Sequence, residues 1–189
     1  MKGDPTCTNL PIDGPKCNYA YPFWTDTTGN FWVYIRPDLW QYKPASNVWT
    51  IRPGYSGTCL NIQAPVGVFD SLNCPGGHIN GAFTWTTPDN SLWIYGGIGE
   101  SAESSSMLWK YNIALNQWAW MGTFSPPDYG IKGVPSVSNK PGYRQESNTS
   151  WVDDLGNLWF FGGGNCTNDV WKYDVPTGIW TWMSGSNVD

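Results

Sequence analysis

Short segments of this chain alternate aromatic and polar residues, which is the pattern of β-strands with one buried face. The clearest examples are Trp40-Gln41-Tyr42, Trp109-Lys110-Tyr111 and Trp171-Lys172-Tyr173. Because successive side chains of a strand point to opposite faces, both rings of each triplet are expected on one face and the polar residue on the other. Signals for helices are almost absent, so the pattern predicts an all-β protein.

The tryptophans recur at fixed spacings and divide the chain into three copies of one unit. Within a copy the first two tryptophans are 8 residues apart and the last two are 9 apart, whereas the middle gap is 8, 16 or 12 residues. The three sets are Trp24, Trp32, Trp40 and Trp49; Trp85, Trp93, Trp109 and Trp118; and Trp151, Trp159, Trp171 and Trp180. A constant framework with one variable loop indicates a structural repeat.

Each copy is expected to form a four-stranded antiparallel sheet. In the first copy the strands are predicted over 18–25, 31–35, 38–42 and 48–52, and turns with the sequences DTTGN, TPDN and DDLGN join the first two strands of the three copies. The copies occupy 18–52, 79–121 and 145–183 of a repeat region over 18–186, after a Cys/Pro-rich segment over 1–17. The connections over 53–78 and 122–144 are too long for hairpin loops, so they are candidates either for functional loops or for covers of a sheet edge.

Composition supports this class and argues against others. Aromatic residues make up 16% and charged residues 13% of the 189-residue chain, which also contains 22 Gly and 15 Pro. These proportions, without a long apolar run, are typical of a turn-rich β protein and argue against disorder and membrane insertion. A formal net charge of −5 without a basic stripe argues against nucleic acid as a partner.

The expected compartment depends on two opposing observations. No apolar segment follows Met1 to Pro5, so no secretory signal is seen there, which is compatible with the cytoplasm. Against this stand five cysteines and two glycosylation sequons, at Asn148 and Asn165. We interpret the chain as an extracellular or cell-surface protein shown without its leader.

The cysteine spacing favours two disulfides within loops. Cys7 and Cys17 bracket the loop before the first copy, and Cys59 and Cys74 bracket the loop before the second. Zinc is the competing interpretation, but the chain has no CxxC pair and a single histidine. Cys166 is left over, either as a free thiol, as a partner across copies or as a link to another chain.

Candidate catalytic residues are scarce. His78 is the single histidine and aligns with Arg144 at a strand entry, where a structural hydrogen bond is expected. No Gly-x-Ser-x-Gly motif or Cys-His pairing supports a hydrolase, so no catalytic residue, metal or cofactor is predicted and the chain is expected not to be an enzyme. Asp153-Asp154 is compatible with calcium, but it lies in a turn that the other copies also build, and turn chemistry is the preferred interpretation.

Three features resemble the Kelch family of β-propellers. A double glycine follows the second strand, at Gly96-Gly97 and at Gly162-Gly163. A tyrosine and a tryptophan of the third and fourth strands are always 7 residues apart: Tyr42 and Trp49, Tyr111 and Trp118, Tyr173 and Trp180. Ahead of the first strand, Pro141-Gly142-Tyr143-Arg144 is similar to the family's Pro-x-x-Arg entry, with Pro75-Gly76-Gly77-His78 in the matching columns. The first copy departs from the pattern, with Val33 to Arg36 in place of the double glycine and Cys17 in the arginine column.

The resemblance implies Kelch-type propeller blades whose aromatic rings fill the wedge between neighbouring sheets. Propellers close with about 4 to 8 blades, so three blades imply a fragment of a longer chain, a ring completed by further copies, or an assembly in which neighbours cover the open faces. Copper-radical oxidases also use Kelch-type propellers, but such a site needs at least two histidines, which this chain does not have.

Two functions are compatible with these patterns. The first is an extracellular structural or assembly module whose partners are other copies or other subunits. The second is recognition of a glycan or protein ligand by the loop face of the propeller. The candidate binding residues are Tyr55, Tyr129, Tyr143, Arg144 and His78, with Tyr19 and Tyr21 as further exposed aromatic residues.

Overall fold

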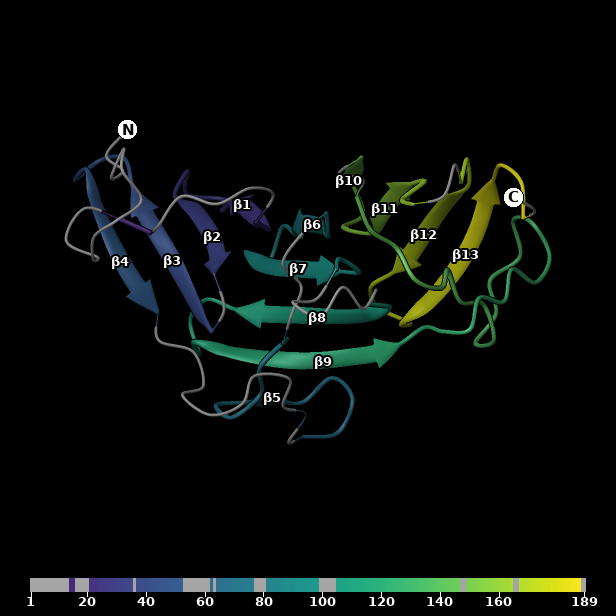
Figure 1. Ribbon diagram of the computed structural model, residues 1–189, viewed down its shortest axis with the longest axis horizontal. Coiled ribbons are helices and arrows are strands. Elements are labelled where there is room, and N and C mark those ends of the chain that lie inside the picture. The colour runs from purple at the N-terminus through teal and green to yellow at the C-terminus, as the bar shows by residue number, and fades with distance from the viewer. Residues whose placement is uncertain are drawn as a thin grey trace.

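The fold is all-β over the part of the chain that the computed structural model describes. That part comprises residues 14–15, 21–35, 37–52, 62, 64–76, 81–98, 105–146, 149–164 and 167–187. Its thirteen strands form three antiparallel sheets, and no helix occurs among these residues (Figure 1). The predicted fold class is therefore confirmed at the level of antiparallel sheets.

The first and third sheets are the expected four-stranded meanders. The first contains β1 (Phe23–Thr25), β2 (Phe31–Ile35), β3 (Asp38–Lys43) and β4 (Val48–Arg52) in that order. The third contains β10 (Ser150–Val152), β11 (Leu158–Phe161), β12 (Val170–Asp174) and β13 (Ile179–Ser184). The first strand is shorter than predicted, since β1 begins at Phe23 and residues 18–20 lie outside the described part.

The second sheet has five strands, which corrects the prediction of four. Its members are β5 (Phe69–Asp70), β6 (Phe83–Thr86), β7 (Ser91–Tyr95), β8 (Met107–Asn112) and β9 (Gln117–Thr123), in the order β5-β9-β8-β7-β6. The added strand β5 comes from the connection over 53–78 and pairs with Trp118 and Ala119 of β9. An outer strand leaves one row of backbone groups unpaired, and β5 satisfies part of that row. Two residues are too few to show a strand pattern in the sequence.

Both long connections cover the outer strand of the sheet that follows them. The amide of Gly67 donates to the carbonyl of Trp120 at 2.8 Å, and the amide of Gly133 donates to that of Trp182 at 2.7 Å. In the same way, Asn73 and Asn139 donate through Nδ2 to the carbonyls of Trp118 (2.9 Å) and Trp180 (3.0 Å). Of the two roles expected for these connections, covering a sheet edge is therefore realised.

The turns between the first two strands are built by one repeated contact. The indole of the second tryptophan donates to the residue that opens the turn: Trp32 to Asp26 at 2.8 Å, Trp93 to Thr87 at 3.0 Å and Trp159 to Asp153 at 2.8 Å. Burial alone raises the pKa of Asp26, but hydrogen bonds from Trp32, Thr28 and Asn30 outweigh it and lower the pKa to about 2. The interpretation of Asp153 as a turn residue agrees with this geometry.

The three sheets fan out side by side, with β1, β6 and β10 at the inside of the fan and β4, β9 and β13 at its outside (Figure 1). Each sheet packs its face against the next, and the buried side chains form two clusters, one in each interface. Over the described residues the sheets do not close into a barrel or ring.

Candidate functional site

The same four positions lie on one face of each sheet, and in the first two sheets this face packs against the sheet that follows. We call it the forward face. Its members are Trp24, Trp32, Tyr34 and Leu39 in the first sheet; Trp85, Trp93, Tyr95 and Leu108 in the second; and Trp151, Trp159, Phe161 and Val170 in the third. In the first and second sheets all four side chains are buried. In the third sheet Trp151 is 42% and Phe161 41% exposed.

The opposite surface, which receives the preceding sheet, is the backward face. Its members are Phe31, Val33, Trp40, Tyr42 and Trp49 in the first sheet; Leu92, Ile94, Trp109, Tyr111 and Trp118 in the second; and Leu158, Phe160, Trp171, Tyr173 and Trp180 in the third. All ten residues of the second and third sheets are buried. The first sheet is less well covered, since Phe31, Tyr42 and Trp49 are partly exposed.

Equivalent ring pairs build the two interfaces. Trp32 meets Tyr111 edge-on with centroids 6.1 Å apart, and Trp93 meets Tyr173 edge-on at the same 6.1 Å. The neighbouring pairs are Tyr34 with Trp118 at 5.8 Å and Tyr95 with Trp180 at 5.3 Å. The chain therefore uses one docking geometry twice.

A hydrogen bond also repeats across the two interfaces. The indole of Trp24 donates to the carbonyl of Trp93 at 2.8 Å, and the indole of Trp85 donates to the carbonyl of Trp159 at 2.8 Å. Trp151 holds the same position in the third sheet, where its ring stacks on Trp159 at 5.6 Å. No described residue accepts a hydrogen bond from the Trp151 indole.

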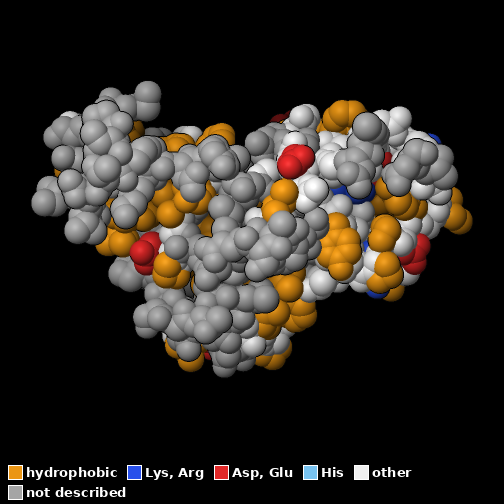
Figure 2. All heavy atoms as spheres, viewed as in Figure 1, with side chains coloured by type: hydrophobic (Ala, Val, Ile, Leu, Met, Phe, Trp, Pro, Cys, Tyr) orange, Lys and Arg blue, Asp and Glu red, His pale blue; other side chains and the backbone are white. Residues whose placement is uncertain are grey.

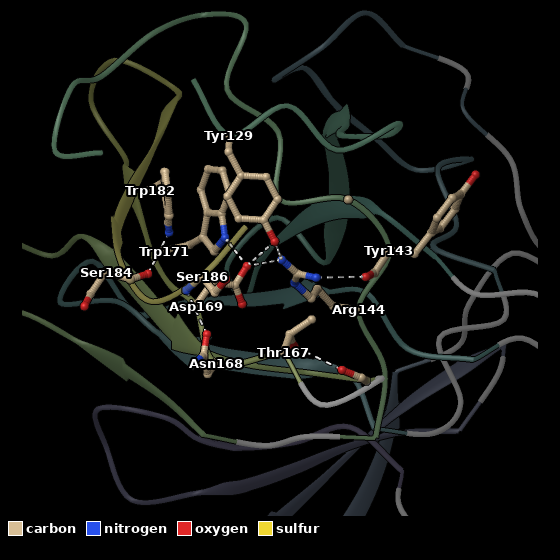
Figure 3. Close-up of polar contacts among 12 residues, drawn as sticks. Tyr129, Tyr143, Arg144, Thr167, Asn168, Asp169, Trp171, Trp182, Ser184 and Ser186 are labelled. Carbon is tan, nitrogen blue, oxygen red and sulfur yellow. Dashed lines mark hydrogen bonds and ion pairs between the residues drawn. The ribbon is translucent and has the colours of Figure 1, made fainter. Parts of the chain in front are cut away.

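Near the entry to the third sheet, three polar side chains converge on the buried carboxylate of Asp169 (Figure 3). The Oδ2 atom of Asp169 accepts three hydrogen bonds: from Nη2 of Arg144 at 2.5 Å, from the hydroxyl of Tyr129 at 2.6 Å and from the indole of Trp171 at 2.8 Å. Both Arg144 and Asp169 are buried. Burial raises the pKa of the Tyr129 hydroxyl, and its hydrogen bond to Asp169 raises it further.

The backbone of Arg144 joins the second sheet to this cluster. Its carbonyl accepts the amide of Gly97 at 2.7 Å, and its amide donates to the carbonyl of Ser105 at 3.3 Å. Gly96 has a φ of +74°, and a Cβ there would lie 2.5 Å from the Arg144 carbonyl oxygen. The double glycine therefore gives the Arg144 strand entry room to approach the turn after β7.

The charged groups of this cluster pair with each other in the interior of the protein. One oxygen of Asp169 takes three donors, while Oδ1 of Asp169 and Nε of Arg144 are buried without a partner among the described residues. The guanidinium also lies 5.7 Å from the centre of the Phe160 ring. The arrangement contains no nucleophile poised beside a base, and its chemistry is that of a buried ion pair that positions the connection on the third sheet.

The structure brings together two of the five predicted binding residues. Tyr129 and Arg144 both contact Asp169, whereas Tyr143 points away from them and is 55% exposed (Figure 3). Tyr55 and His78 lie outside the described residues, so a binding role for the five residues stays a prediction.

The modification and disulfide predictions fall mostly outside the described part of the chain. This applies to Asn148 and Asn165, the predicted glycosylation residues, and to Cys7, Cys17, Cys59 and Cys166. Cys74 is described: it is buried and disulfide-bonded, and its sulfur lies 3.6 Å from the Tyr34 hydroxyl. The predicted pairings Cys7–Cys17 and Cys59–Cys74 stay predictions.

Asp169 was missed by sequence reasoning, although the repeat contains a signal for it. It stands two residues before the third tryptophan of its copy, a column that holds Asp38 and Met107 in the other copies. The third copy alone combines an acidic residue in this column with an arginine at the strand entry. Asn73 and Asn139 were missed too, and both lie in a shared motif, Gly-Val-x-x-x-x-Asn-x-Pro-Gly, at 67–76 and 133–142.

Taken with the fold, these contacts define a chain of antiparallel sheets stacked in series by aromatic faces. Neither the family models nor the curated proteins give a match to this chain. Among solved structures, the chain is similar to the one titled "Structure of YjhT", with 15% sequence identity and a TM-score of 0.46. The match covers 90% of this chain and 49% of that one, so the chain spans about half its length. A similarity this distant carries no argument about function.

Membrane-spanning helices and metal-binding clusters are both absent from the described residues. None of their elements is a helix with the length and apolar character needed to cross a membrane. No group of three or more His, Cys, Asp and Glu side chains within the described ranges has a geometry that could hold a metal ion.

Proposed function

We propose that this chain is a non-enzymatic, extracellular assembly module built of Kelch-like propeller blades, and that it contacts further protein through the forward face of its third sheet. The Kelch assignment is supported by the four-stranded meanders, by their stacking with first strands inside, and by the glycines beside the Arg144 entry.

The exposed forward face of the third sheet is the observation that carries the proposal. The same columns are buried in the two preceding sheets, where they pack against the next sheet in the chain. Contiguous apolar surface that stays exposed in a monomer often marks an interaction site. The surface in Figure 2 also shows several groups of hydrophobic side chains with few charged ones between them.

Covering this face would contribute favourably to association. An aromatic ring buries on the order of 150 to 250 Å² when fully covered. Covering the exposed parts of Trp151 and Phe161 at about 25 cal/mol per Å² stabilises a contact by roughly 3 to 5 kcal/mol, before the loss of motional freedom on binding. Further rings of the face add to this gain.

The extracellular part of the proposal is supported by the cysteines. Cys74 is disulfide-bonded, and structural disulfides persist in oxidising compartments. Mass spectrometry of the native protein tests it: glycan mass on the Asn148 or Asn165 peptides is expected, and finding both unmodified with all five thiols reduced would overturn this assignment.

A chain extended by one repeat tests the assembly role. Residues 123–187 are added a second time directly after Ser184, which continues the repeat in register because Gly122 and Ser184 hold equivalent positions. The added sheet is expected to cover Trp151 and Phe161. Amides of 149–161 should then exchange hydrogen as slowly as those of 83–95, which the third sheet already covers. Unchanged exchange in 149–161 would contradict the proposal.

A further inference from the structure

The two ends of the fan present complementary surfaces. The third sheet ends in an exposed forward face, and the first sheet begins with a partly exposed backward face. On that backward side Phe23 is 54% exposed, and its ring lies 6.0 Å from that of Phe31. One chain thus carries both halves of the interface that it builds twice within itself.

We propose that a second copy of this chain occupies the forward face of the third sheet, with the backward face of its own first sheet, and that the two copies close head to tail. The inference rests on the proposed assembly role and names its partner. Each copy then contributes one forward and one backward face, giving two identical interfaces related by a two-fold axis.

The ring contacts of the internal interfaces define what the new one must contain. By the repeat columns, Trp159 meets Tyr42 of the second copy as Trp32 meets Tyr111 and Trp93 meets Tyr173. Phe161 meets Trp49 of the second copy, as Tyr34 and Tyr95 meet Trp118 and Trp180. All four side chains are at least partly exposed in the single chain.

The repeated hydrogen bond fixes the register of this contact. Its donors are the first tryptophans and its acceptors the carbonyls of the second tryptophans in the next sheet. Trp151 is the donor that remains at one end, and the carbonyl of Trp32 is the equivalent acceptor at the other. A head-to-tail partner pairs these two groups, whereas two forward faces packed on each other would bring two donors together.

The arrangement of the sheets allows the contact to close. The fan is open on the side opposite its outer strands (Figure 1), and the proposed arrangement places the three sheets of the second copy on that side. A head-to-tail contact produces a ring where its rotation closes and a filament where it does not. Gly14 lies against Trp49, since a Cβ on Gly14 would be 2.7 Å from the Trp49 indole nitrogen, so this residue packs on part of the backward face of the first sheet.

Sedimentation velocity over a concentration series tests the inference on the 189-residue chain. Since one chain has a mass of 21.1 kDa, the expected species is a dimer of about twice that mass. The double variant Trp151→Glu and Phe161→Ser should sediment as a monomer with an unchanged circular dichroism spectrum. Leu155→Ala is the matched control, because Leu155 is 84% exposed in a turn of the same sheet, and it should remain dimeric.

Mixing variants tests the head-to-tail arrangement. Phe23→Glu damages only the backward face and should also be monomeric alone. Mixed with the Trp151→Glu and Phe161→Ser variant, it should form a one-to-one dimer, because each pair retains one intact interface. A Phe23→Glu protein that dimerises alone would overturn the arrangement.

Sedimentation of the wild-type chain and hydrogen exchange of the extended chain test different parts of the proposal. A wild-type monomer at all concentrations overturns the second copy as partner, and slow exchange in the extended chain would still support the assembly role. Fast exchange in the extended chain refutes both.

Discussion

At the residue scale, we expect the free energy of unfolding to depend strongly on the buried ion pair between Arg144 and Asp169. Its charges have left water, so removing one partner leaves the other uncompensated. We expect Arg144→Met to lower the free energy of unfolding by about 3 to 5 kcal/mol, measured by urea denaturation. The control is Lys110→Met, which breaks an exposed pair with Asp89 and should lower it by at most about 1 kcal/mol. Equal losses in the two variants would contradict the role of burial in the contribution of the Arg144–Asp169 pair.

A second residue-scale prediction concerns acid. The folded-state pKa of Asp26 is about 2, against an ordinary value of 3.8. The ionised carboxylate therefore stabilises the fold fully at pH values above 3.8. Protonation removes this contribution as pH falls from about 4 towards 2. We expect Asp26→Asn to reduce the dependence of the unfolding free energy on pH in that window, followed by denaturation at several pH values. A variant with the wild-type slope would contradict the assignment.

At the scale of the element, the turn after β7 depends on Gly96. Its φ of +74° and the close Arg144 carbonyl both oppose a side chain. Gly29 is the matched control, since its φ is +83° and a Cβ there meets nothing within 4 Å. Gly29→Ala should lower the unfolding free energy by about 1 kcal/mol, and Gly96→Ala by clearly more. Thermal and urea unfolding of both variants measure the difference, and equal effects would refute a steric role for Gly96.

At the scale of the whole molecule, tryptophans of one repeat column are expected to contribute differently to the unfolding free energy. Trp85 and Trp151 occupy the same column, but Trp85 is buried and its indole is bonded to the third sheet. Trp85→Ala should lower the unfolding free energy of the dilute monomer by about 3 to 5 kcal/mol. Trp151→Ala should lower it less, because this side chain is 42% exposed in the single chain. Similar losses would mean that the third sheet has no open forward face.

The strand framework was largely predictable because each strand carries its own information. The predicted strands over 31–35 and 48–52 coincide with β2 and β4, since alternating rings and turn residues are local features. The strand β5 was not predictable in this way, because Phe69 and Asp70 form a strand only where β9 offers an open edge. The partner of Arg144 was likewise hidden, since Asp169 lies 25 residues away in the chain.

The sequence by itself determined the repeat, the strands and the faces on which the aromatic side chains lie, because period-two alternation and turn chemistry act between near neighbours. Tertiary structure decided which of these faces is covered. Trp24, Trp85 and Trp151 are the same residue at the same repeat position, yet two are buried and one is half exposed. Burial depends on the sheet that packs against each ring, and no pattern within one copy contains that information.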